Sequence, residues 1–196
     1  MGLSIHYSGS FRNGASLPEM IEEVKDIAEV HKWGYNIHEE QFSDNTIDDT
    51  SSNQHIYGIS FTPPNCETVS LCFLSNRKMC SVVYLHFLGK TEDKPELGGS
   101  SMISVKTQYA GVEVHKIIIH LFQYLNKKYF QDFKMTDEGK YWETGDAKLL
   151  KEIFNRYTEM IQNFSSAIEN YPMNAGETVE TYFEGLIKQI HDKKTK

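Results

Sequence analysis

Apolar and polar residues alternate, or recur at helical spacing, along most of the chain, and this pattern predicts its elements. Residues 3–11 alternate between the two classes, which is typical of a half-buried strand. Residues 16–34 predict a helix, because Ser16 and Glu19 form a capping box and apolar residues follow at spacings of three and four. Gly34 is expected to end this helix in the left-handed conformation.

The middle of the chain predicts most of a sheet. Strand-like runs occupy residues 35–42, 55–61, 68–74, 80–88 and 102–110. Polar, turn-rich stretches at 43–54 and 89–101 predict loops.

Three helices are predicted in the second half. Residues 111–129 read as a mostly buried helix, and residues 147–170 carry a long amphipathic stripe. Pro172 and Gly176 interrupt the pattern before a last amphipathic helix.

This order of elements favours the α+β class over regular βαβ alternation. We expect a largely antiparallel sheet of about five to seven strands packed against about four helices. One domain over residues 1–196 is the expected organisation, with residues 172–196 as a peripheral C-terminal helix.

Composition narrows the class of protein. Hydrophobic residues make up 39% and aromatic residues 12% of the 196 residues, which suits a globular chain and not a disordered one. The net charge of −7 argues against general nucleic-acid binding, which needs a basic surface, and would suit a basic partner.

The cysteines and the apolar runs indicate a location. Cys66, Cys72 and Cys80 are odd in number and form no CxxC pair, so we expect reduced thiols in a cytoplasmic protein. The first residues lack a secretory signal, and no apolar run is long enough to cross a membrane.

No catalytic or cofactor motif identifies an activity. The sequence contains no GxSxG, GxxxxGK[ST], HExxH or GxGxxG pattern, so no cofactor or metal site is predicted. His115 and His120 are five residues apart, about 140° around a helix, and cannot share one helical face as an i, i+4 pair of metal ligands would. We expect a packed or boundary His115 and a solvated His120.

The polar face of the predicted sheet is where an enzyme active site could lie. Polar residues opposite the apolar rows are His6, Ser70, Cys72, His86 and Lys106. If strand pairing brought His6, His86 and Lys106 together, the group could bind an anion or transfer protons. The alternative is that one face of an antiparallel sheet meets water.

The segment DEGKYWETGDAKLL, residues 137–150, combines acids with aromatic residues. It predicts a hairpin with Tyr141 and Trp142 in its second strand, and Gly139 at positive φ in the turn. Thr144 or Asp146 is expected to cap the following helix.

The predicted turn and helix cap do not explain every residue of this segment. Trp142 and Glu143, beside Tyr141 and near Asp146, predict a binding surface, because exposed aromatics next to acids often serve recognition. The alternative is that Trp142 fills the gap between hairpin and helix.

Three segments resemble uncharacterised bacterial proteins of similar length. They read YGISFTPPNCETVSLCF, VKTQYAG and KKYFQDFKMTDEGKYWETGDAKLLKEIF, and the resemblance covers about the central two thirds of the chain. It implies a bacterial source and no activity.

The sequence thus supports three hypotheses. The first is a cytosolic binding or interaction protein, for example an immunity or antitoxin-like protein that blocks a basic toxin. The second is a small hydrolase or transferase that uses the polar sheet face. The third is a homo-oligomer that self-associates through the helix after Gly176.

Overall fold

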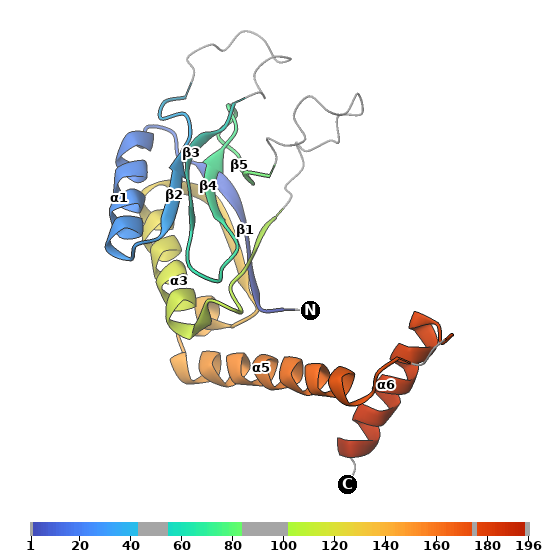
Figure 1. Ribbon diagram of the computed structural model, residues 1–196. Helices are drawn as coiled ribbons and strands as arrows, with labels where there is room; N and C mark the ends of the chain where they lie inside the picture. Colours follow the sequence, from blue (N-terminus) through green and yellow to red (C-terminus); the bar gives the residue numbers. More distant parts are fainter. Residues whose placement is uncertain (1, 43–54, 84–101, 174–175, 195–196) are drawn as a thin grey trace. The chain divides into compact units, whose positions relative to one another are not determined.

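The computed structural model describes residues 2–42, 55–83, 102–173 and 176–194 of the chain (Figure 1). Most of the predicted strand 80–88 and both predicted loops, 43–54 and 89–101, lie outside the described residues. The chain divides into two compact units, residues 1–151 and residues 152–196.

The first sheet contains three antiparallel strands in the order β6-β1-β7. Their bounds are Ser4–Phe11 for β1, Ile103–Lys106 for β6 and Phe130–Asp137 for β7. The predicted alternation in β1 is confirmed, because Ile5 and Tyr7 are buried while His6 lies on the opposite, partly exposed face. His6 pairs with Ser104 on one side and Thr136 on the other.

The second sheet contains four antiparallel strands in the order β2-β3-β4-β5. Their bounds are Gly34–Ile37, Tyr57–Thr62, Val69–Phe73 and Met79–Cys80. The α+β prediction is therefore confirmed, with the seven strands of the described residues divided between two sheets.

Tyr7 and Phe11 of β1 join the two sheets. The Tyr7 hydroxyl donates to the Ser70 carbonyl oxygen at 2.8 Å and accepts from the Ser70 N–H at 3.0 Å. The Phe11 N–H donates to the Arg77 carbonyl oxygen at 2.8 Å, and the Phe11 ring packs edge-on against Phe73. The core of the first unit is thus continuous across both sheets.

Helix α1 (Leu17–Val30) packs against β2 and β3 (Figure 1) and begins as predicted, since Ser16 Oγ accepts from the Glu19 N–H at 3.3 Å. Its end differs from the prediction, because Lys32 and not Gly34 adopts positive φ. The N–H groups of Lys32 and Trp33 donate to the carbonyl oxygens of Glu29 and Ala28, which is the Schellman arrangement. Gly34 instead begins β2.

Helix α3 (Gly111–Lys128) packs against β7, the next element along the chain, and the short helix α4 (Tyr141–Thr144) follows β7. Its buried face is the predicted helical stripe, with Ile118, Phe122 and Leu125 fully buried. Phe122 lies 4.5 Å from the Tyr7 ring centroid, so the helix closes the core over the first sheet.

Helix α5 (Ala147–Asn170) begins in the first unit, and the second unit holds the rest of α5 and α6 (Val179–Lys194). Both helices lie where the pattern predicts them. Phe164 and Phe183 stack with ring centroids 6.3 Å apart, and the Tyr182 hydroxyl donates to the Tyr171 carbonyl oxygen at 2.8 Å. The single-domain organisation stays a prediction. None of the helices in the described part of the chain is long and apolar enough to cross a membrane.

Candidate functional site

The aromatic-acidic segment is a strand, a turn and a short helix, so the predicted hairpin is wrong. Strand β7 ends at Asp137, and the chain then turns into α4 instead of a second strand. Lys140, and not Gly139, adopts positive φ, at 61°. The reason is the Asp137 carboxylate, which accepts from the N–H groups of Gly139, Tyr141 and Trp142 at 2.7, 2.8 and 3.0 Å and so satisfies the start of a helix.

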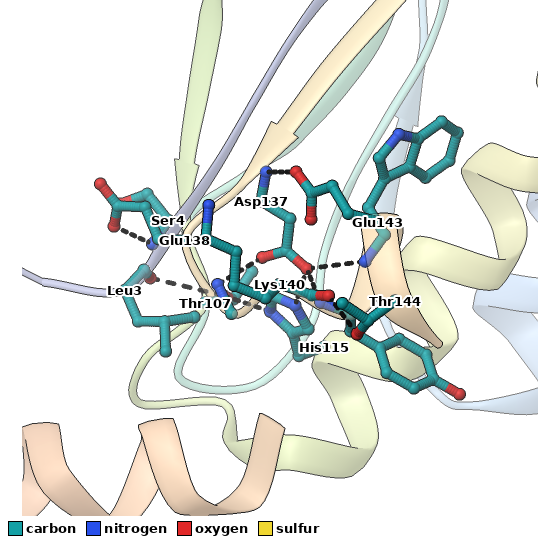
Figure 2. Close-up of polar contacts among 12 residues, drawn as sticks. Leu3, Ser4, Thr107, His115, Asp137, Glu138, Lys140, Glu143 and Thr144 are labelled. Atoms are coloured by element: carbon teal, nitrogen blue, oxygen red, sulfur yellow. Dashed lines mark hydrogen bonds and ion pairs between the residues drawn. The ribbon is translucent and has the colours of Figure 1, made fainter. Parts of the chain in front are cut away.

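A buried histidine holds the same carboxylate from the other side (Figure 2). His115 Nε2 donates to Asp137 Oδ2 at 3.2 Å, and His115 Nδ1 lies 2.8 Å from Thr107 Oγ1. In a neutral ring the Thr107 hydroxyl donates to Nδ1; in a charged ring Nδ1 donates, and the hydroxyl donates to the Leu3 carbonyl oxygen 3.4 Å away.

Thr107, His115 and Asp137 have the residue types of a nucleophile–base–acid triad, but their burial excludes that role. All three have no exposed surface, so no substrate reaches them. Gly139 closes the cluster, because a Cβ there would lie 3.1 Å from His115 Nε2 and 3.0 Å from Asp137 Oδ1. The cluster therefore fixes the turn and the helices around it. The prediction of a packed His115 is confirmed.

The charge state of Asp137 follows from these contacts. Burial alone would raise the pKa of Asp137, but the hydrogen bond and charge of His115 and the N–H groups of Trp142 and Gly139 outweigh it and hold the pKa below its ordinary value. The carboxylate is therefore ionised at neutral pH.

Each of the four predicted binding residues has a structural contact. Tyr141 is buried, and its hydroxyl lies 3.1 Å from Nε2 of the exposed His120. Trp142 is half-buried and packs edge-on against Phe133. Glu143 accepts from the Asp137 N–H at 3.2 Å, and Asp146 caps α5 by accepting from the N–H groups of residues 148 and 149.

On the outer face of the first sheet, His6 contacts two residues that the sequence did not single out. His6 Nδ1 lies 2.7 Å from Ser104 Oγ, and His6 Nε2 lies 3.4 Å from Glu138 Oε1. Glu138 Oε2 accepts from the Ser4 N–H at 2.8 Å, which orients the carboxylate. Lys106 lies in the neighbouring row of this sheet, opposite Ser4.

The remaining members of the predicted face lie elsewhere. Ser70 and Cys72 belong to the second sheet and are buried, so their assignment to a polar face is wrong. The cause is that β4 is covered on both faces, where a period of two carries no information about exposure. His86 lies outside the described residues.

The thiols carry no sign of activation. Burial raises the pKa of Cys66 and of Cys72 to about 12, and it also raises the pKa of Cys80. All three are free, as expected, and within the described residues no group of three histidine, cysteine or acidic side chains could hold a metal ion.

The second unit exposes large apolar side chains at helical spacing. Three come from α5 and three from α6, and each set follows the pattern i, i+4, i+8. We define the C-terminal apolar face as Met160, Phe164, Ile168, Val179, Phe183 and Ile187, which are 39–62% exposed. The sequence predicted the two stripes, and the helices of this unit leave much of each stripe uncovered.

Comparison of the chain with protein-family models, with curated proteins and with solved structures finds no match. This result is consistent with the resemblance to an uncharacterised family, and it assigns no activity to the residues described above.

Proposed function

We propose that this protein acts by binding another protein and that the C-terminal apolar face is its binding surface. The observation that carries the proposal is the exposure of six large apolar side chains on two contacting helices. Contiguous apolar patches on this scale mark interaction sites, because leaving them in water is unfavourable. The aromatic-acidic segment supports the proposal less well, because each of its residues has a structural contact.

The setting of this binding protein is the bacterial cytoplasm. The resemblance to bacterial proteins and the three free cysteines support it. An immunity or antitoxin-like role, in which the chain blocks a basic toxin, is one form of the proposal, and the net charge of −7 supports that form.

Crosslinked capture from the native organism tests this function. The baits are the full chain, a Phe164→Glu/Ile187→Glu variant and a Trp142→Ala/Glu143→Ala variant. We expect the partner to be retained by the first and third baits and lost from the second, because a charge in an apolar interface is costly to bury. A partner retained equally by the first two would remove the apolar face from binding.

A second candidate function rests on the hydrogen-bonded group of Ser104, His6 and Glu138. Ser104 is exposed, and the His6 and Glu138 side chains are 29% and 38% exposed, so small molecules reach the group. In an ester hydrolase of this kind, His6 Nδ1 would take the Ser104 proton while Oγ attacks the carbonyl carbon. That proton would leave with the alcohol, and water would then release the acid.

Hydrolysis of p-nitrophenyl acetate tests the second candidate. Ser104→Ala and His6→Gln are expected to lose at least about tenfold in rate, since each removes a reacting group. The matched control is Ser8→Ala, which lies on the same strand face two residues from His6. Equal rates for Ser104→Ala and Ser8→Ala would end the hydrolase candidate.

A further inference from the structure

The spacing of apolar residues in α5 is that of a helix inside a bundle. Residues 157, 160, 164 and 167 of α5, together with Tyr171 directly after it, follow alternating steps of three and four, the spacing of the a and d positions of a heptad. Ile161 and Ile168 add a third apolar position in each heptad. A seam that is three positions wide is typical of a helix that faces the core of a bundle or a globular protein, and within the second unit the helix that contacts it is α6.

The composition of this stretch is that of an interface. Between Tyr157 and Tyr171 only Glu159 and Glu169 are charged, while the chain as a whole has 24% charged residues. Tyrosine, phenylalanine and methionine side chains occupy the seam. Interface cores are depleted in charge and enriched in aromatic residues and methionine in this way.

The exposed area matches what a dimer needs. With exposures of 39–62%, the six side chains of the C-terminal apolar face offer roughly 500 Å² to a partner, taking about 150–250 Å² for a fully exposed large side chain. A stable interface buries about 800 Å² on each side, of which about 65% is apolar in homodimers. The face thus accounts for the apolar part of one such interface.

Charge selects the occupant. An acidic chain of net charge −7 repels its own copies except where charge is sparse, and the α5 part of the C-terminal apolar face is such a surface. On the basis of the binding function proposed above, we propose that the occupant is a second copy of this chain, so that the C-terminal apolar faces of two copies pair about a two-fold axis.

Light scattering on the full chain across a concentration series tests this assembly. We expect twice the mass of the 22.6 kDa chain for the unmodified protein and a single mass for Phe164→Glu and for Ile187→Glu. Ile187 is 62% exposed, so its replacement costs the fold little even if Phe164→Glu disturbs the ring stack. The matched control Ser166→Glu adds the same charge about 200° around α5 from Phe164 and should remain dimeric.

A monomeric mass for the unmodified chain at every concentration overturns the assembly. In that case, binding of anilinonaphthalene sulfonate distinguishes the two proposals. Dye fluorescence that is lost in Ile187→Glu would show an open face, so the binding function would stand with a different partner. If the dye gains no fluorescence with the unmodified chain, the chain covers its own apolar face, and both proposals fail.

Discussion

At the scale of single residues, Asp137 determines the geometry of the predicted site. Its carboxylate accepts three backbone N–H groups and one histidine N–H while having no exposed surface. The density of acids and aromatic residues marks this segment in the sequence, but it does not distinguish an acid that starts a helix from an acid in a hairpin turn. That choice depends on His115, which is 22 residues away in the chain.

Replacing Asp137 with asparagine is expected to destabilise the fold by about 3–5 kcal/mol, because it leaves buried partners without an ionised acceptor. Urea unfolding followed by circular dichroism measures this loss. Asp146→Asn is the matched control, and it should change stability by less than about 0.5 kcal/mol because asparagine caps helices as well as aspartate does. Similar losses in the two variants would contradict the role assigned to Asp137.

The lowered pKa of Asp137 makes stability depend on pH. A carboxyl whose pKa is lower in the folded state stabilises the fold at pH values above its unfolded pKa, which is near 3.8. This contribution is lost as the pH falls from that value through the folded pKa. The unfolding midpoints of the unmodified chain and Asp137→Asn should therefore differ most above about pH 5 and converge below pH 3.8. A constant difference from pH 7 to pH 3 would show that the ionisation of Asp137 does not stabilise the fold.

At the scale of elements, local patterns predicted most helices and strands, and tertiary contacts decided the exceptions. The spans of α5 and β1 follow directly from periodicity, and Ser16 and Asp146 cap the helices as expected. Helix α4 was missed because four residues show no period, and its start is fixed by the distant partners of Asp137. Of the exposed group Ser104, His6 and Glu138, the sequence singled out only His6. The order of the strands brings the three residues together, and the local pattern does not give that order.

The turn between β7 and α4 requires glycine at position 139 because the surrounding side chains leave no room for a Cβ. A Cβ there would lie 2.6 Å from Cδ1 of the fully buried Leu150, so Gly139→Ala should cost about 1–3 kcal/mol. Gly34→Ala is the control, because no atom lies within 4 Å of a Cβ at that position. Thermal unfolding of both variants checks the comparison, and equal melting temperatures would show that the turn relaxes freely.

At the scale of the whole molecule, the sequence predicted the α+β class but not the two sheets or the uncovered helices. A periodic stripe shows which side of a helix is apolar, and it does not show what covers that side. The pattern therefore located the stripes of α5 and α6, whereas only the structure shows that Phe164 and Ile187 remain 42% and 62% exposed. We propose this exposed face as the working surface of the protein.

The central claim is that a second copy of the chain covers this face, and hydrogen exchange of α5 at two protein concentrations tests it most directly. If the C-terminal apolar face is covered by a second copy, the amides of residues 157–171 will exchange slowly at high concentration and faster on dilution. The amides of β1 will exchange at the same rate in both samples, because β1 lies within the core of the first unit. Exchange in α5 that does not change with concentration would contradict the claim.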